Sequence, residues 1–256
     1  MIAATKPAPR RLVLFDLDGT LIDSEPGITA CLAHAFERIG AELPAREVLR
    51  TWIGPPFRQT FPSVLGDDEA RIVAAIDHYR DRFEDVGWSE HAIYDGIPEL
   101  IAALAASGDA LAVVTTKPEL QARLIVDHFP FGGAFGRVYG PSDRHAHRSK
   151  AEMIADALAD FGVRAEHATM IGDRHFDIEG ARANDVRGLG VAWGFGSVEE
   201  LRDAGAHAIA ERPAELARLL GHRLPSPIAS ATTPRAAAQD RRATAAPTCR
   251  PRRRAQ

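Results

Sequence analysis

The 256-residue chain is predicted to be an α/β protein with a parallel sheet and one inserted group of helices. A continuous apolar run at 12–15 leads directly into Asp16 and Asp18, and such runs are typical of strands covered by helices on both faces. From 96 to 220, apolar strand candidates alternate with amphipathic helices, which indicates parallel strands joined by crossovers. Between 24 and 90 only helical periodicity occurs, so we interpret this stretch as an insertion.

The insertion is predicted to begin at Ser24, because Pro26 fits the first turn of a helix. Apolar residues then recur at helical spacing until Gly40. Two further helices are predicted near 48–52 and over 69–83.

The remaining elements are predicted from the alternation of apolar runs and amphipathic segments, with glycines after two of the helices as stop signals. The predicted helices cover 98–107, 119–128, 150–161, 177–184 and 214–220, and the predicted strands cover 110–114, 137–139, 167–171, 188–192 and 206–209.

Charge is distributed unevenly along the chain. The net charge is −4, but 222–256 contains eight arginines and one acid, so this segment carries +7 and the rest carries −11. The segment is rich in small and polar residues and poor in large apolar ones, which predicts a disordered tail. A basic tail could contact a polyanion, but the acidic body does not favour nucleic-acid binding, and we expect a solvated extension.

The location of the protein is predicted from what the chain lacks. Cys31 and Cys249 do not form a disulfide framework and fit a reducing cytoplasm. No apolar run reaches membrane-spanning length, and the first residues lack the apolar centre of a secretory signal. We therefore expect a cytoplasmic protein without a membrane partner. The sequence leaves the oligomeric state open.

Polar side chains follow several of the predicted strands. Because the carboxyl ends of parallel strands meet at one edge of a sheet, these side chains are expected to converge. Carboxylates there suit Mg²⁺ and nucleophilic attack on phosphorus, while an ammonium and a hydroxyl suit the transferring oxygens. The residues are Asp16, Asp18, Thr115, Asp173 and Asp177, together with Lys150 at the start of a helix.

These residues resemble the four ordered motifs of the haloacid dehalogenase superfamily. The motifs are DLDGT at 16–20, Thr115, Lys150 and GDRHFD at 172–177. The insertion resembles the small cap of the phosphoglycolate phosphatase-like branch, and the sequence around the last motif is similar to a 5′-nucleotidase-like subset. The resemblance covers 11–220 and implies a Rossmann-like core. The implied parts are an extension at 1–10, a core at 11–23 and 91–221, a helical cap at 24–90 and the tail at 222–256.

The resemblance also implies roles for the site residues. Asp16 would be the nucleophile, and Asp18 would protonate the leaving oxygen and then activate water. Thr115 would bind the phosphate, and Lys150 would stabilise its charge. The Mg²⁺ ligands would be Asp16, Asp173 and the backbone carbonyl of Asp18, with Asp177 in the outer shell of the metal or orienting Lys150.

Several assignments have alternatives. Thr115 could simply end a strand, and Thr116 could hold the phosphate in its place. The family commonly has asparagine at the position of Thr116, so this chain departs there from the family's phosphate contacts. The chain has three lysines among 31 basic residues, so a lysine at a motif position is informative. Lys117 is a rival for the role of Lys150, but we expect its side chain to point away. Arg58 would suit an anionic substrate group, although a surface arginine is the more frequent case.

Three other polar residues have interpretations that need no catalytic role. Asp177 could be a first-turn acid that favours the helix dipole. His145 and His147 are interpreted as part of a polar loop, because no third metal ligand is visible.

The predicted function is hydrolysis of a phosphate monoester. An acid two residues after the nucleophile is needed when the leaving group is a poor one, such as an alkoxide. A sugar-phosphate phosphomutase of the same fold, or a non-catalytic binding protein, is the alternative. The expected substrate is a small phosphorylated metabolite, either phosphoglycolate or a nucleoside 5′-monophosphate.

Overall fold

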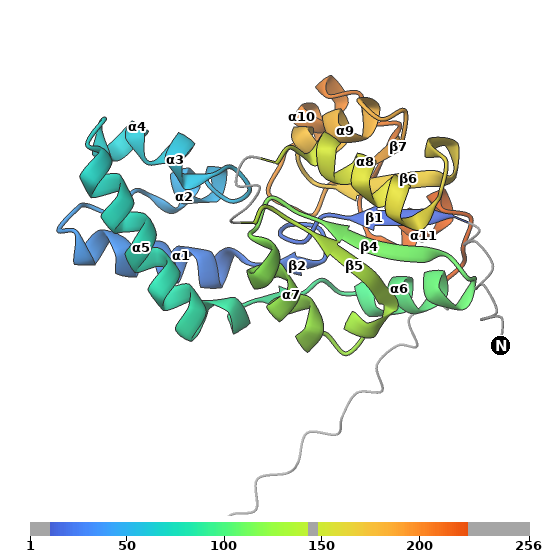
Figure 1. The fold of residues 1–256 in the computed structure, drawn as a ribbon, viewed down its shortest axis with the longest axis horizontal. Coiled ribbons are helices and arrows are strands. Elements are labelled where there is room, and N and C mark those ends of the chain that lie inside the picture. The colour runs from blue at the N-terminus through green and yellow to red at the C-terminus, as the bar shows by residue number, and fades with distance from the viewer. Residues whose placement is uncertain (1–10, 143–147, 225–256) are drawn as a thin grey trace, which may run out of the picture. The chain divides into compact units, whose positions relative to one another are not determined.

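The computed structural model describes residues 11–142 and 148–224. A six-stranded sheet with the order β5-β4-β1-β6-β7-β8 forms its centre, and every neighbouring pair of strands is parallel (Figure 1). The predicted α/β fold with a parallel sheet is therefore confirmed. The strands are β1 (Leu12–Phe15), β4 (Ala110–Val114), β5 (Phe135–Tyr139), β6 (Ala168–Gly172), β7 (Arg187–Val191) and β8 (Ala208–Ala210).

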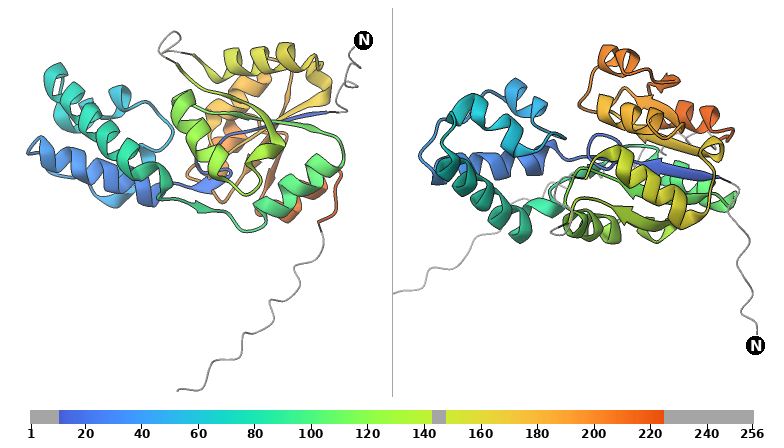
Figure 2. Two further views of the ribbon diagram at one scale, coloured as in Figure 1. Left: turned by 60° about the horizontal axis from the view of Figure 1, so that its bottom comes forward. Right: turned by 45° about the horizontal axis from the view of Figure 1, so that its top comes forward.

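Helices cover both faces of the sheet, as Figures 1 and 2 show. Because side chains alternate along a strand, Leu12 and Leu14 of β1 pack on one face and Val13 and Phe15 on the other. The first face is covered by α8 (Lys150–Phe161) and α9 (His175–Arg182), and the second by α6 (Ile97–Ala106), α7 (Glu119–His128) and α11 (Pro213–Leu219). This two-sided burial explains why β1 is a continuous apolar run.

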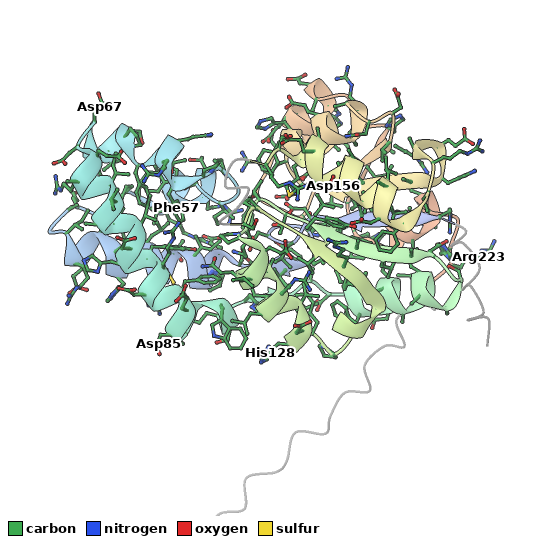
Figure 3. All side chains as sticks on the ribbon, viewed as in Figure 1. Phe57, Asp67, Asp85, His128, Asp156 and Arg223 are labelled. Atoms are coloured by element: carbon green, nitrogen blue, oxygen red, sulfur yellow. The ribbon has the colours of Figure 1, made fainter. Side chains whose placement is uncertain are left out.

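The helical segment between β1 and α6 has an apolar interior that is continuous with the core on one face of the sheet. It contains α1 (Glu25–Arg38), α2 (Arg46–Thr51), α3 (Phe57–Thr60), α4 (Pro62–Leu65) and α5 (Glu69–Asp85), with α1 packed along α5 (Figure 2). Aromatic rings in contact with one another fill much of this interior, and Phe57 is labelled in Figure 3. The rings belong to Phe36, Trp52, Phe57, Phe61, Tyr79 and Phe83.

A short antiparallel ribbon marks where the chain enters and leaves the helical segment. It pairs β2 (Ile22–Asp23) with β3 (Ala92–Ile93). Two-residue strands give no periodicity, so this ribbon was absent from the sequence-based prediction. The short helices α3, α4 and α10 (Val198–Asp203) were also not predicted.

Some predictions fall outside the described residues. These are the extension at 1–10, nearly all of the tail at 222–256, and the loop histidines His145 and His147. Within the part of the chain that the structure describes, no helix is both long and apolar enough to cross a membrane.

Candidate active site

The site is built at the carboxyl edge of three neighbouring strands. Asp16 follows β1, Thr115 follows β4 and Asp173 follows β6, and β1 lies between the other two strands. The Asp16 N–H donates to the Ile171 carbonyl at 2.8 Å, so the sheet ladder continues one residue past β1 and fixes the backbone of Asp16. The predicted convergence of strand-end residues is therefore a consequence of strand order.

Lys150 connects two of the acidic residues. Its Nζ lies 2.8 Å from Asp16 Oδ1 and 2.6 Å from Asp177 Oδ1, and it donates to the Val114 carbonyl at 2.7 Å. An ammonium group has three N–H donors, and three oxygen atoms surround this one. The side chain is only 2% exposed, so these contacts replace its hydration. Ser149 caps α8 through its side chain and thereby fixes where Lys150, the first residue of that helix, lies.

The charge of Lys150 is retained despite its burial. Burial lowers the pKa of the Lys150 ammonium, but the Asp16 and Asp177 carboxylates more than offset this effect, so the pKa lies above its ordinary value. For Asp177, burial raises the carboxyl pKa and the adjacent ammonium opposes that increase. Of the two roles expected for Asp177, its direct ion pair with Lys150 favours the orienting one.

Asp173 is a fully buried carboxylate held by backbone. Its Oδ2 accepts from the Phe195 N–H at 2.7 Å, and its Oδ1 lies 3.4 Å from the Thr20 hydroxyl. Burial, together with the carboxylates of Asp16 and Asp177, raises the pKa of Asp173 to about 8. Without a cation, therefore, this carboxyl group binds a proton at neutral pH.

Two glycines allow the backbone to approach Asp173 closely. A Cβ on Gly19 would lie 2.3 Å from Asp173 Oδ2, and a Cβ on Gly194 would lie 2.4 Å from Asp173 Cβ. Gly19 also has φ +81°, a conformation that side-chain-bearing residues rarely adopt. Glycine at 19 is thus required by both the turn and the packing around the carboxylate.

The acidic residues suit a divalent cation. One carboxylate oxygen from each of Asp16, Asp173 and Asp177 lies within 4.8 Å of the others, and all three residues are buried. When all three are ionised, Lys150 balances only one of their charges, which leaves a net charge of −2 at the site. Carboxylate oxygens are the ligands that Mg²⁺ prefers. The donor set and the uncompensated charge therefore fit the metal that the sequence predicts.

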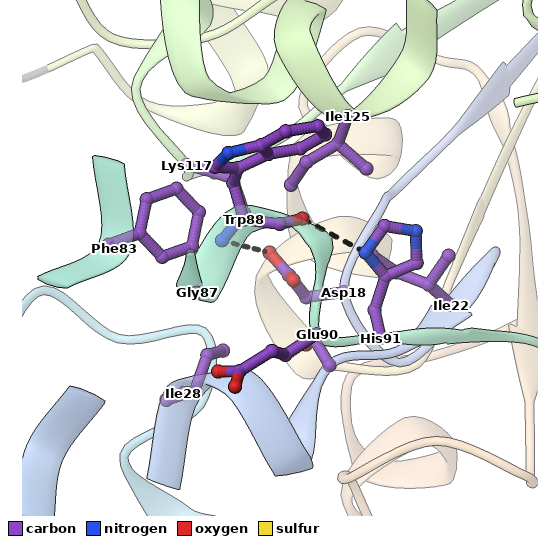
Figure 4. Close-up of a pocket in the computed structure, with 11 residues that line it drawn as sticks. Asp18, Ile22, Ile28, Phe83, Gly87, Trp88, Glu90, His91, Lys117 and Ile125 are labelled. Atoms are coloured by element: carbon purple, nitrogen blue, oxygen red, sulfur yellow. Dashed lines mark hydrogen bonds and ion pairs between the residues drawn. The ribbon is translucent and has the colours of Figure 1, made fainter. Parts of the chain in front are cut away.

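Asp18 has a partner that the sequence analysis did not predict. We expected Lys117 to point away, and that expectation is wrong, because Lys117 Nζ lies 3.1 Å from Asp18 Oδ2 and its side chain is 7% exposed (Figure 4). The Lys117 N–H donates to Thr115 Oγ1 at 3.2 Å, which fixes the backbone just after β4. The scarcity of lysine in the chain was the signal that could have identified it.

The other candidate residues lie at different distances from this centre. Thr115 is buried at the end of β4, the strand next to β1, whereas the Thr116 hydroxyl donates to the Gly54 carbonyl of the helical segment at 2.9 Å. Arg58 forms an exposed ion pair with Glu69 on the helical segment. The phosphate contact of Thr115 or Thr116 and the substrate contact of Arg58 remain predictions.

Arg174, which the sequence analysis did not single out, joins the site to the helical segment. Its Nη1 donates to the Ile53 carbonyl at 2.7 Å, and its Nε donates to Glu200 Oε1 at 2.9 Å. Burial raises the pKa of Glu200, but hydrogen bonds from the His175 backbone and from Arg174 lower it to about 2. Glu200 is therefore ionised and fixes the arginine that contacts the helical segment.

A cavity of about 470 Å³ lies between the loop at 54–56 of the helical segment and the starts of α8 and α9. Small-molecule sites usually have volumes of about 300–1,000 Å³. Lys150 is the one residue of the acidic centre that lines the cavity, and the buried carboxylates lie outside its lining. Thr116 and the half-buried ring of Phe176 form part of its wall. A second, much smaller cavity lies beside Asp18 (Figure 4).

Buried carboxylates, an ammonium and a hydroxyl at the carboxyl edge of a parallel sheet are groups suited to phosphoryl transfer. Residues 13–191 match the model of the haloacid dehalogenase-like hydrolase family, and the chain belongs to this family. The predicted family is thus confirmed, and the chain is a phosphatase of that superfamily.

The similar proteins that carry names include phosphatases and a kinase. A 5′-nucleotidase of Pseudomonas aeruginosa is 44% identical over 207 residues, which span 81% of this chain and 92% of that protein. The tyrosine-protein kinase PtkA of Mycobacterium tuberculosis is 37% identical over 190 residues, which span 74% of this chain and 64% of that protein. The crystal structure of a predicted phosphatase from Clostridium acetobutylicum is similar, with a TM-score of 0.76 and 36% sequence identity. The match covers 83% of this chain and 98% of that chain. Phosphoglycolate phosphatases are among the more distant relatives.

Proposed function

We propose that this phosphatase uses Mg²⁺ to hydrolyse small phosphate monoesters, and that the phosphoryl group is first transferred to the Asp16 carboxylate and then to water. The observation that carries the proposal is the position of Asp16. It lies at the end of the central strand, beside the Lys150 ammonium and within the group of three buried carboxylates. A carboxylate placed next to a cation and a metal site can attack phosphorus.

The reaction takes place in two steps, each with a defined proton movement. In the first, an Asp16 carboxylate oxygen forms a bond to phosphorus while the ester P–O bond breaks, and Asp18 gives its proton to the leaving oxygen. In the second, Asp18 accepts a proton from water, the water oxygen bonds to phosphorus, and the bond between phosphorus and Asp16 breaks. Inorganic phosphate and the free carboxylate of Asp16 result.

The surrounding residues balance charge during both steps. Lys150 holds Asp16 in place and offsets the negative charge on the phosphoryl oxygens, and Thr115 donates a hydrogen bond to them. Asp16, Asp173 and the backbone carbonyl of Asp18 would hold Mg²⁺, with Asp177 orienting Lys150. When bound there, the metal supplies positive charge that stabilises the transferring phosphoryl group.

The proposed substrates are small phosphorylated metabolites, and a nucleoside 5′-monophosphate is favoured over phosphoglycolate. The 470 Å³ cavity beside Lys150 is large enough for a ligand of that size, with the Phe176 ring in its wall. The P. aeruginosa relative named as a 5′-nucleotidase is also more similar to this chain than the phosphoglycolate phosphatases are. In this proposal Arg58 must leave Glu69 before it can contact a substrate anion.

The proposal predicts phosphate release that depends on a divalent cation. Purified protein is assayed against p-nitrophenyl phosphate and a panel of nucleoside monophosphates, sugar phosphates and phosphoglycolate, with Mg²⁺ and with EDTA. We expect turnover with Mg²⁺, loss of turnover in EDTA and recovery when excess Mg²⁺ is added. Equal rates in Mg²⁺ and EDTA would contradict the metal requirement, and no release from any ester would contradict the function.

The raised pKa of Asp173 predicts that Mg²⁺ binding depends on pH. Because the pKa is about 8 in the metal-free fold, above the ordinary value near 4, the native protein holds a proton that the unfolded chain has lost. Metal-free stability should therefore fall as pH rises towards 8. Mg²⁺ must displace this proton, so the increase in Tm caused by Mg²⁺ should grow between pH 6 and pH 9. An increase in Tm that is constant across this range would show that Asp173 is not protonated without metal.

A further inference from the structure

Lys117 is a buried cation for which the proposed reaction has no role. Its ammonium is 3.1 Å from Asp18 Oδ2 and 4.9 Å from the centre of the Phe83 ring. Figure 4 shows the lysine between these two groups, at the wall of the smaller cavity. A lysine side chain that is 93% buried has given up most of its hydration, which is costly unless a charged partner replaces it.

The two carboxylate oxygens of Asp18 lie in different surroundings. Oδ2 faces the Lys117 ammonium, whereas Oδ1 is buried and has no hydrogen-bond partner among the described residues. A buried carboxylate oxygen without a partner is unfavourable unless a ligand completes it. The unpaired Oδ1 is therefore the atom available to exchange a proton with a substrate or with water.

We infer that Lys117 is a positioning residue, which holds Asp18 by Oδ2 so that Oδ1 faces the leaving oxygen of the ester. This inference rests on the proposed function, because it assigns Lys117 to the acid–base step of that reaction. The ammonium also stabilises the carboxylate that forms when Asp18 gives up its proton. A free Asp18 side chain could rotate, and general acid catalysis requires a fixed hydrogen-bond geometry.

The helical segment helps to hold the lysine. Phe83 belongs to α5, and its ring lies on the side of the ammonium away from Asp18. A cation over an aromatic face is attracted to it, and more strongly where water is excluded. The orientation of the acid thus depends on contact between the helical segment and the sheet edge, so that Asp18 is fully oriented only when the segment is in place.

The inference predicts an effect that depends on the leaving group. An alkoxide needs a proton as it leaves, whereas p-nitrophenolate is stable enough to leave without one. Loss of Lys117 should therefore slow hydrolysis of an alkyl ester more than hydrolysis of p-nitrophenyl phosphate. A lysine that served only to stabilise the fold would affect both esters equally.

The experiment measures kcat/KM for p-nitrophenyl phosphate and for the best alkyl ester in the panel, with Lys117→Met, Lys117→Arg and Asp18→Asn. General acid–base catalysis contributes about 10²–10⁴-fold, and we expect Lys117→Met to lower the ratio of alkyl to aryl kcat/KM by about 10-fold. Asp18→Asn should lower that ratio further, and Lys117→Arg should retain part of it because a cation remains. Phe83→Leu, which keeps the apolar packing, should lower the ratio in the same direction by a smaller factor.

Arg80→Met is the matched control, because Arg80 is an exposed cation on the same helix as Phe83. Its ratio should equal that of the wild type. A ratio unchanged in Lys117→Met and Phe83→Leu, whether or not both rates fall, would overturn the inference and leave the proposed function intact. Absence of turnover by the wild-type protein would instead overturn the proposed function.

Discussion

Replacing Asp16 with asparagine is expected to lower phosphate release by about 10⁴-fold or more, because removing a covalent nucleophile usually costs an enzyme that much. The amide has nearly the same shape as the carboxylate but is a very poor nucleophile. The fold should survive, since Lys150 still pairs with Asp177 at 2.6 Å. Phosphate release from p-nitrophenyl phosphate measures the effect, and circular dichroism and Tm measure the fold.

Asp67→Asn is the control for this experiment. Asp67 is exposed just before α5 and projects from the helical segment (Figure 3). The same chemical change at that position should leave the rate within about twofold, since surface substitutions rarely have large effects. Turnover by Asp16→Asn at the wild-type rate would exclude Asp16 as the nucleophile.

Replacing Lys150 with methionine is expected to impair both catalysis and stability. The change leaves Asp16 and Asp177 as buried carboxylates without their shared cation. Breaking a buried ion pair in this way costs about 3–5 kcal/mol of the free energy of unfolding. Loss of a charge that stabilises the transition state lowers kcat by about 10²–10³-fold. Denaturant unfolding without metal and steady-state kinetics measure the two effects.

Two further variants test whether the shared charge causes the stability loss. Asp177→Asn combined with Lys150→Met removes one of the two buried carboxylates that have lost their cation. The double variant should therefore be more stable than Lys150→Met alone. Lys150→Arg keeps the charge, but a planar guanidinium does not match three oxygens around one nitrogen, and activity should remain low. A double variant less stable than Lys150→Met would contradict the shared ion pair.

Much of the fold could be predicted because its signals are local. The apolar run of β1 reflects burial on both faces, and the helix over 119–128 was predicted with the bounds of α7, Glu119–His128. The ribbon of β2 and β3 could not be predicted, since its stability comes from pairing between residues about 70 positions apart. The extra helices α3 and α4 are single turns, which are too short to show periodicity.

The convergence of Asp16, Thr115 and Asp173 could be expected, because it follows from parallel strands meeting at one edge. The partners of individual side chains could not be predicted from residue type. Lys117 pairs with Asp18, and its backbone N–H bonds to the Thr115 hydroxyl, a local geometry that the sequence does not specify. Arg174 likewise contacts the Ile53 carbonyl, 121 positions away.

The measurement that tests the central claim most directly is mass spectrometry of the enzyme quenched in acid during turnover. The account predicts a peptide that contains Asp16 with the added mass of one phosphoryl group, absent from Asp16→Asn and from wild-type protein incubated without substrate. Lys150→Met should show less of it. A phosphoryl group on a different residue, or none while the enzyme is releasing phosphate at its steady rate, would contradict the account.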